Sequence, residues 1–207
     1  MSRPVPDLFY PIVPDLTWIE RLVPLGVRTV QLRLKDAEDG EIARQIVAGL
    51  AICKAHGCEL IVNDYWRYAI MLGASYVHLG QEDLAGADVA AIRAAGMGLG
   101  ISTHDERELA IALAADPDYV ALGPIYETTL KKMKWAPQGL ERLGAWKARA
   151  GRPLVAIGGI TLARADGVRA AGADSIAVVT DIVTSPTPER RIADWLAWSR
   201  TSARGRL

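Results

Sequence analysis

The sequence contains few of the residues that would indicate a secreted, disulfide-rich or nucleic-acid-binding protein. It has two cysteines, three histidines and one phenylalanine in 207 residues, and 24 Lys and Arg balance 24 Asp and Glu. Without a charge excess, neither nucleic acid nor an anionic membrane is expected as a partner. Cys53 and Cys58 lie in CKAHGC with no second pair of ligands, which argues against zinc and favours free thiols in a reducing cytoplasm.

Long apolar runs are also missing. None approaches the roughly 18 residues of a membrane span, and the N-terminal MSRPVPDLFY has no apolar core of the signal-peptide kind. We therefore expect a cytoplasmic protein without a membrane anchor. Hydrophobic residues make up 50% of the chain and charged residues 23%, which suits one packed core. We expect a single domain over residues 1–200 and a frayed tail over residues 201–207.

Short apolar runs alternate with stretches of helical periodicity about eight times. The predicted strands are 8–13, 29–34, 60–62, 76–79, 98–102, 119–122, 154–157 and 175–179. The predicted helices are 16–25, 41–56, 66–72, 87–95, 106–115, 140–150, 162–171 and 189–198. Such alternation predicts an α/β fold with a parallel sheet, and eight units in about 200 residues favour a small (β/α)8 TIM barrel. A doubly wound open sheet is the alternative, but no GxGxxG follows the first strand.

Polar residues gather where the predicted strands end. They include Gln31, Arg33, Lys35, Asn63, Asp64, Gln81, Glu82, Asp83, Ser102, Thr103, His104, Thr180 and Asp181. TIM barrels carry their active sites at the C-terminal ends of the strands. Because the N-terminal ends have fewer polar residues, the asymmetry predicts an enzyme rather than a passive scaffold.

Asp64 and Asp83 follow two consecutive predicted strands that a short helix connects. A right-handed crossover makes such strands parallel, so both carboxylates are expected at one edge of the sheet. Two carboxylates there suit a hard cation such as Mg2+. The alternative is that each aspartate caps the helix that follows it, and these residues alone favour neither interpretation.

A further set of residues suits phosphate. Its members are Arg33, Lys35, Lys131, Gly158, Gly159, Val179 and Thr180. Adjacent glycines let backbone N–H groups approach an anion, and the loops after strands seven and eight form the phosphate site of many TIM barrels. The alternatives are interior ion pairs for Arg33 and Lys35 and a plain tight turn for the glycines.

Three aromatic residues near these groups have simpler explanations. His78 is expected to be a hydrogen-bonded histidine within a strand. His104 is expected at a helix start, without a chemical role. Trp135 either covers the site or is an incidental surface aromatic.

Several segments resemble the thiamine-phosphate synthase family. They are VQLRLK (30–35), LIVND (60–64), VHLGQEDL (77–84), GISTH (100–104), GPIYETTLKK (123–132), APQGL (136–140), AIGGIT (156–161) and GADSIAVVTDI (172–182). The resemblance covers nearly the whole chain, in order and with matching spacing. The stretch VNDYWRYAIMLGASYVHLGQEDL is a specific match, whereas GGI alone would be weak.

The resemblance implies a transferase on a (β/α)8 barrel. Such an enzyme joins 4-amino-2-methyl-5-hydroxymethylpyrimidine diphosphate to thiazole phosphate and releases diphosphate. In this family the diphosphate leaves first, and the thiazole nitrogen attacks the resulting pyrimidine-methyl cation. The implied partners are therefore small molecules.

The resemblance also implies roles for individual residues. Asp64 and Asp83 would bind Mg2+. The pyrimidine diphosphate would be held by Gln31, Arg33, Lys35, Asn63, Ser102 and Lys131, of which Arg33, Lys35, Ser102 and Lys131 are the catalytic candidates. The thiazole phosphate would be held by Thr128, Thr129, Gly158, Gly159, Val179 and Thr180.

Two positions depart from the family pattern. Where the family usually has Pro-Thr-x-Thr-Lys, residues 127–131 read ETTLK, so Leu130 replaces a threonine and Thr129 is the expected substitute. Leu34 stands where the family usually has glutamate. The ETTLKK loop is also similar to that of the related thiazole tautomerase, in which His104 or a neighbour would serve as acid–base group. That relative lacks the acid after strand four, so Asp83 favours the synthase.

Two further alternatives stay open. A barrel that only binds thiamine precursors would also resemble this family, although Asp64, Asp83 and Lys131 argue against lost catalysis. The sequence does not indicate an oligomeric state, and a homo-oligomer is one of the open alternatives.

Overall fold

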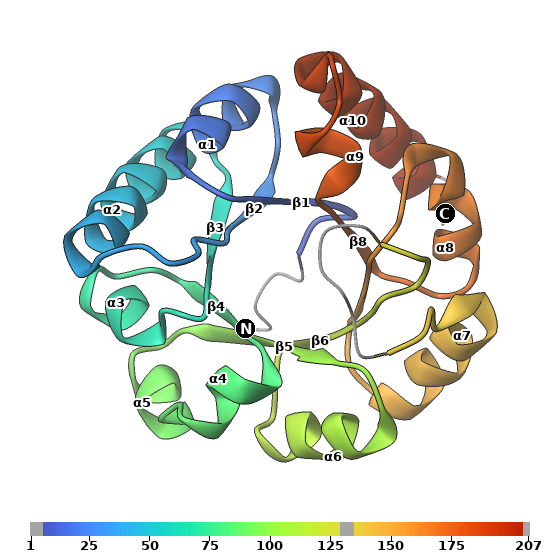
Figure 1. Cartoon of the computed structure of the whole chain (residues 1–207), viewed down its shortest axis with the longest axis horizontal. Coiled ribbons are helices and arrows are strands. Elements are labelled where there is room, and N and C mark those ends of the chain that lie inside the picture. Colours follow the sequence, from blue (N-terminus) through green and yellow to red (C-terminus); the bar gives the residue numbers. More distant parts are fainter. Residues whose placement is uncertain (1–5, 129–134, 205–207) are drawn as a thin grey trace.

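The computed structural model describes residues 6–128 and 135–204, and it contains a closed barrel of eight parallel strands inside a ring of helices (Figure 1). The strands are β1 Phe9–Val13, β2 Thr29–Leu32, β3 Glu59–Asn63, β4 Tyr76–Leu79, β5 Gly98–Thr103, β6 Tyr119–Leu122, β7 Leu154–Ile157 and β8 Ser175–Val178. Each strand pairs with the next, and β1 closes the barrel by pairing with β8 through Tyr10 and Ala177. The predicted TIM barrel is confirmed, and the open-sheet alternative is wrong.

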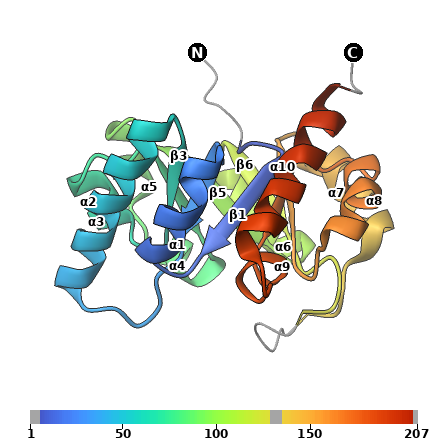
Figure 2. The same cartoon turned by 90° about the horizontal axis from the view of Figure 1, so that it is seen from above.

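The helices that surround the barrel agree with the predicted ones at most positions. They are α1 Leu16–Leu22, α2 Asp39–His56, α3 Trp66–Met71, α4 Gln81–Ala85, α5 Val89–Ala94, α6 Glu106–Ala114, α7 Gly139–Ala150, α8 Ala165–Ala170, α9 Thr180–Val183 and α10 Pro188–Arg204. Two 3-10 turns, η1 Val23–Leu25 and η2 Leu162–Arg164, follow α1 and precede α8. Figure 2 shows β1 pointing toward the face that carries the β2–α2 connection, and the last turns of α10 lie toward the opposite face.

The structure differs from the sequence-based expectation at the C-terminal end and at two short helices, α4 and α9, that were not predicted. Helix α10 continues to Arg204, so residues 201–204, expected in a frayed tail, are helical, while residues 205–207 lie outside the described part of the chain. Helix α4 was not predicted, because Leu84 is its one buried residue and a single apolar position shows no helical period. It places Asp83 in its first turn.

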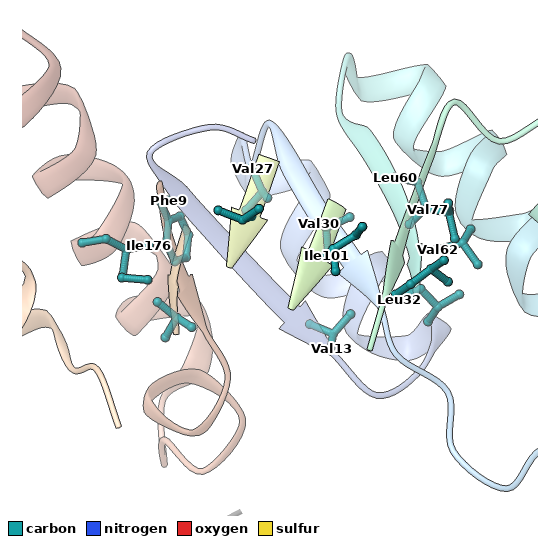
Figure 3. Close-up of a cluster of buried hydrophobic side chains, with 14 of the residues drawn as sticks. Phe9, Val13, Val27, Val30, Leu32, Leu60, Val62, Val77, Ile101 and Ile176 are labelled. Atoms are coloured by element: carbon teal, nitrogen blue, oxygen red, sulfur yellow. The ribbon is translucent and has the colours of Figure 1, made fainter. Parts of the chain in front are cut away.

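Alternate residues of the strands face two separate cores. Those that point outward pack under the helices, and Figure 3 shows Phe9, Val13, Val30, Leu32, Leu60, Val62, Val77, Ile101 and Ile176 among them. Those that point inward form a smaller cluster of Tyr10, Ile12, Ile61, Tyr76, Tyr119, Ala121, Val155 and Ala177. This alternation follows from the two-residue period of a strand. The interior is therefore packed with side chains.

Glycines on β5 make room for aromatic rings inside the barrel. A Cβ atom on Gly98 would lie 2.2 Å from Cε1 of Tyr76, and one on Gly100 would lie 2.0 Å from Cζ of Tyr119. Both distances are far below van der Waals contact, so β5 has to carry glycine at these two inward positions. The tyrosine rings of β4 and β6 fill the space that the glycines leave.

Candidate active site

Asp64 and Asp83 meet at the C-terminal ends of β3 and β4. Asp64 follows β3 in the left-handed backbone region, with φ of 64°, and its N–H donates to the carbonyl of His78 at 2.9 Å. Asp83 is in the first turn of α4, the helix that follows β4. The two carboxyl groups are hydrogen-bonded to each other, and the amide of Asn63 donates to Oδ2 of Asp64.

The acid pair is electrostatically unfavourable when both carboxyls are ionised. Burial, and then the charge of Asp83, raise the pKa of Asp64 to about 6. The Gly80 amide and the charge of Arg33 act in the opposite direction. Two carboxyl groups share a hydrogen bond only when one is protonated, and a divalent cation can replace that proton. The pair therefore has the chemistry of a cation ligand set.

The helix-capping alternative for these aspartates is wrong. Asp15, Asp88 and Asp105 do cap helices, accepting hydrogen bonds from the amides of Trp18, Ala91 and Glu108. In contrast, α3 begins after Tyr65 and α4 begins after Gly80, and neither start has a side-chain cap. The carboxyls of Asp64 and Asp83 therefore do not serve as helix caps.

The acid pair fits Mg2+ better than a metal held by protein alone. Within residues 6–128 and 135–204, no group of three or more His, Cys, Asp or Glu side chains could hold a metal ion. Mg2+ keeps several waters and commonly uses one or two carboxylates together with substrate phosphates. Two carboxylates at an open strand edge match this incomplete set.

Of the polar residues at the end of β2, Arg33 acts on the acid pair through its charge. Gln31 is buried at the end of β2, and Arg33 is half-buried just beyond it. The charge of Arg33 lowers the pKa of both Asp64 and His78, which places its guanidinium near both groups. Among the described residues neither Arg33 nor Lys35 forms an ion pair, so the structure does not support the interior ion-pair alternative.

Ser102 and His78 connect the next two strands. His78 Nε2 lies 2.8 Å from Ser102 Oγ, and His78 Nδ1 lies 3.0 Å from the hydroxyl of Tyr119. The Ser102 carbonyl accepts a hydrogen bond from Gln81 Nε2 at 2.7 Å. Burial, and to a smaller extent the charge of Arg33, lower the pKa of His78 to about 3. His78 is therefore neutral and bonded at both nitrogens, as expected for a histidine inside a strand.

Gly158 and Gly159 form a tight turn that packs against the segment after β6. Their φ angles are 98° and 64°, and a Cβ on Gly159 would lie 2.2 Å from the carbonyl oxygen of Glu127. The Tyr126 amide donates to the Gly158 carbonyl at 3.0 Å. The turn explains why glycine is required here, and a role in anion binding stays a prediction.

Val179 and Thr180 lie at the end of the neighbouring strand, β8. Val179 precedes α9, and Thr180 is its first residue. The first amides of a helix have no acceptor within that helix, so they can face an anion. Because β7 and β8 are paired, with Ile157 opposite Ala177, both turns open at the same side of the barrel.

The segment between β6 and α7 is described only in part. Thr128 is half-buried and follows Glu127, whose carbonyl faces the glycine turn, whereas Thr129 and Lys131, two predicted site residues, lie outside the described residues, as does Leu130. Trp135 stacks on His104, with ring centroids 3.9 Å apart and 11° between the ring planes. His104 Nδ1 in turn pairs with Glu108 Oε2 at 2.7 Å. Trp135 is therefore anchored at the end of β5.

Sequence reasoning did not identify two tyrosines beneath the site, of which Tyr10 bonds to a predicted site residue and Tyr119 bonds to Tyr10. Gln31 Nε2 donates to the Tyr10 hydroxyl at 2.6 Å, and the Tyr10 and Tyr119 hydroxyls are 3.2 Å apart. Aromatic residues in strands are usually packing residues, so neither attracts attention in the sequence. The available signal was the pair of glycines at alternate positions of β5, Gly98 and Gly100, which indicates large neighbours inside the barrel.

A closed parallel barrel whose polar residues gather at the C-terminal strand ends defines an enzyme of the TIM-barrel class. Residues 9–182 match the family described as thiamine monophosphate synthase. The chain belongs to this family. The resemblance of its motifs is thereby confirmed.

Individual relatives agree over most of the chain. A thiamine-phosphate synthase of Rhizobium etli is 60% identical over 192 residues, which cover 92% of this chain and 94% of the relative. The thiamine-phosphate synthase of Escherichia coli strain K12 is 52% identical over 187 residues, which cover 90% of this chain and 85% of the relative. The prediction of a transferase enzyme is confirmed.

Solved structures support the fold. Thiamine phosphate pyrophosphorylase from Pyrococcus furiosus superposes with a TM-score of 0.83 at 22% identity, covering 95% of this chain and 96% of that one. A 3-hexulose-6-phosphate synthase superposes with a TM-score of 0.66 at 18% identity, covering 91% and 98% of the two chains. At these identities the likeness shows the barrel alone. Among the described residues, no helix has the length and apolarity to cross a membrane.

Proposed function

We propose that the protein joins 4-amino-2-methyl-5-hydroxymethylpyrimidine diphosphate to thiazole phosphate, giving thiamine phosphate and diphosphate. The family supplies the reaction class. The observation that carries the proposal for this chain is the Asp64–Asp83 pair, because the related tautomerase lacks the acid after strand four. Two carboxylates in contact at the mouth of the barrel suit a diphosphate substrate that arrives with Mg2+.

The side chains near the pair would hold the pyrimidine diphosphate. Asp64 and Asp83 would hold Mg2+, which when bound stabilises the negative charge that develops on the leaving diphosphate. Arg33, whose charge already acts on Asp64, would add positive charge on the same side, together with Lys35 and Lys131. Gln31, Asn63 and Ser102 would orient the substrate with neutral hydrogen bonds.

The thiazole phosphate would bind on the β7–β8 side. There the Gly158–Gly159 turn and Thr180, the first residue of α9, would offer backbone amides, and Val179, Thr128 and Thr129 would complete the site as the family resemblance implies. When the carbon–oxygen bond to diphosphate breaks, the pyrimidine methylene becomes a cation, and the thiazole nitrogen attacks it. No protein nucleophile takes part, so the side chains bind, orient and stabilise charge.

The side chains that fill the barrel beneath the site would prevent water from reaching the cation through the interior. Tyr10, Tyr76 and Tyr119 fill the barrel beneath the site, and none has more than 2% of its surface exposed. A reactive cation in such a site meets the bound thiazole rather than bulk water.

A diphosphate-release assay tests the proposal. Purified protein would be given the pyrimidine diphosphate and the thiazole phosphate, together and singly, with Mg2+ and with a chelator. Release that needs both substrates and the metal supports the synthase. A folded protein that releases no diphosphate would refute it, and interconversion of thiazole tautomers would then be measured.

No observation favours the other candidate functions. For a tautomerase, His104 or a neighbour is the expected acid–base group; Glu108 on its Nδ1 and Trp135 stacked on its ring orient His104 without distinguishing a tautomerase from a synthase. For a barrel that only binds precursors, loss of the acid pair would be expected, and the pair is intact.

Cys53 and Cys58 are free thiols, which supports a location in a reducing cytoplasm. A homo-oligomer stays an open alternative.

A further inference from the structure

A chain of hydrogen bonds crosses the barrel interior beneath the proposed site. It runs from Gln31 on β2 to Tyr10 on β1, then to Tyr119 on β6, His78 on β4 and Ser102 on β5. The four distances are 2.6, 3.2, 3.0 and 2.8 Å. Because β1 and β2 lie across the barrel from β5 and β6, the chain links opposite walls (Figure 1). Both of its ends are residues proposed to contact substrate.

The members of this chain are buried, and the fold requires a glycine beside them. Gln31, Tyr10, Tyr119 and His78 are each at most 6% exposed. A buried polar group needs a partner, so each member constrains the next. Gly100 has no side chain, and any Cβ there would lie 2.4 Å from the hydroxyl oxygen of Tyr119. An ordinary apolar interior would need none of these features.

Counting donors fixes the direction of the chain. Gln31 Nε2 can only donate, so the Tyr10 oxygen accepts from it. In the described part of the chain, the Tyr119 oxygen is then the one acceptor bonded to the Tyr10 hydroxyl. Tyr119 must in turn donate its own proton to Nδ1 of His78. A neutral imidazole that accepts at Nδ1 carries its proton on Nε2 and donates it to Ser102 Oγ.

The direction of these hydrogen bonds determines whether the Ser102 hydroxyl can donate to a ligand or can only accept. When Ser102 Oγ accepts from His78, its own hydroxyl proton is free to point into the mouth of the barrel. In the reverse direction, that proton would be spent on His78 and only lone pairs would face the substrate. An anionic or electron-rich substrate atom needs a donor, so only the first arrangement is useful.

We propose that Tyr119 is a positioning residue of the reaction, whose hydroxyl holds His78 as the Nε2–H tautomer so that Ser102 presents a hydrogen-bond donor to the substrate. Tyr10 connects Gln31 to the same chain, because its hydroxyl accepts from Gln31 and donates to Tyr119. The part that concerns substrate rests on the proposed function, whereas the tautomer of His78 does not.

The first test is Tyr119→Phe, which removes the hydroxyl and keeps the ring that fills the space beside Gly100. Diphosphate release should fall about tenfold in kcat, the size expected for loss of one orienting hydrogen bond, with a smaller change in KM. Tyr68→Phe is the matched control, because the Tyr68 hydroxyl bonds to Asp39 on the outside of the barrel. It should have wild-type kcat.

A double-variant cycle separates positioning from simple destabilisation. If Tyr119 acts through Ser102, then Tyr119→Phe should have almost no further effect on kcat in a Ser102→Ala background. Equal fold-losses in both backgrounds would overturn the proposal, because a structural defect would act whether or not Ser102 is present.

Nitrogen NMR of the histidine side chains tests the tautomer without any turnover. Wild-type His78 should show one neutral tautomer with the proton on Nε2, and Tyr119→Phe should shift the population toward Nδ1–H. A wild-type spectrum with the proton on Nδ1 would overturn the inference, even if Tyr119→Phe failed to fold. If the wild-type protein released no diphosphate, the proposed function would fail, and the NMR result alone would decide this inference.

Discussion

Asp64 and Asp83 are the residues for which the sequence left two interpretations open and the structure supports one. Neither caps a helix, and their carboxyls are in contact. The position of Asp83 depends on α4, which the sequence did not predict, and that of Asp64 depends on a left-handed backbone angle at the end of β3. The pair is thus an outcome of local geometry at two strand ends.

Replacing one member of the pair gives the first prediction. Asp64→Asn should reduce diphosphate release by about 10²- to 10³-fold, because charge on the leaving group loses its stabilisation. The melting temperature should be kept or raised, since the substitution removes the repulsion between two carboxylates. Steady-state rates and thermal unfolding measure both effects.

Glu82→Gln is the matched control for this change. Glu82 is an exposed acid next to Asp83 in the same first turn of α4. Its removal should leave the rate within about twofold, as is usual for surface changes. Full activity of Asp64→Asn would show that the metal assignment is wrong.

His78 gives a prediction about pH. Its pKa is lowered from the ordinary value of 6.5 to about 3 in the folded protein, mainly by burial. Between those two pH values His78 is protonated in the unfolded chain but neutral in the folded protein. Its contribution to stability is therefore fully present above pH 6.5 and is lost as the pH falls. The free energy of unfolding should fall by up to about 1.4 kcal/mol per pH unit from this group.

Chemical denaturation at several pH values between 4 and 7 measures that slope. Carboxyl groups also contribute in this range, so the quantity to compare is the difference between the wild type and His78→Asn. The variant should show a shallower slope, and His56→Asn, at an exposed position on α2, should follow the wild type. Parallel curves for wild type and His78→Asn would contradict the assignment.

At the scale of elements, β5 shows how one strand organises the interior. Its residues alternate between Gly98 and Gly100, which admit tyrosine rings, and Leu99 and Ile101, which pack outward under the helices. The sequence predicted the strand and its polar end at Ser102. It did not predict that the two glycines stand opposite Tyr76 and Tyr119, because pairing partners come from distant parts of the chain.

Gly100→Ala tests this arrangement. The added Cβ would lie 2.0 Å from Cζ of Tyr119, a ring buried on all sides. Overpacking of this kind typically costs about 1–3 kcal/mol or more, and displacement of Tyr119 should also lower kcat. Urea denaturation and the diphosphate assay measure the two losses.

Gly40→Ala serves as the comparison for that variant. Its Cβ would meet nothing within 4 Å at the start of α2, so stability should stay the same or rise by about 0.5–1 kcal/mol. If Gly100→Ala behaved like Gly40→Ala, the close approach of Tyr119 to β5 would be contradicted.

At the scale of the whole molecule, the barrel was predictable because its signals repeat. Eight apolar runs, each followed by a helical stretch, indicate closure even when single boundaries are wrong, as at α4 and α10. The edge that carries Gln31, Asp64 and Ser102 also follows from the direction of parallel strands. The interior chain through Tyr10 and Tyr119 could not be predicted, since it depends on which side chains meet across the barrel.

Ligand binding to the folded barrel gives the last prediction. The acid pair is an incomplete ligand set, so Mg2+ alone should hardly change the melting temperature. Mg2+ with diphosphate should stabilise the protein by about 2.7 kcal/mol at a ligand concentration one hundred times Kd, which corresponds to roughly 5–10 °C for a chain of this size. Asp83→Asn should abolish the metal-dependent part, whereas Glu82→Gln should retain it. If Mg2+ stabilised the protein equally with and without diphosphate, the protein would hold the metal by itself. The prediction that Mg2+ needs ligands from both the acid pair and the diphosphate would then be wrong.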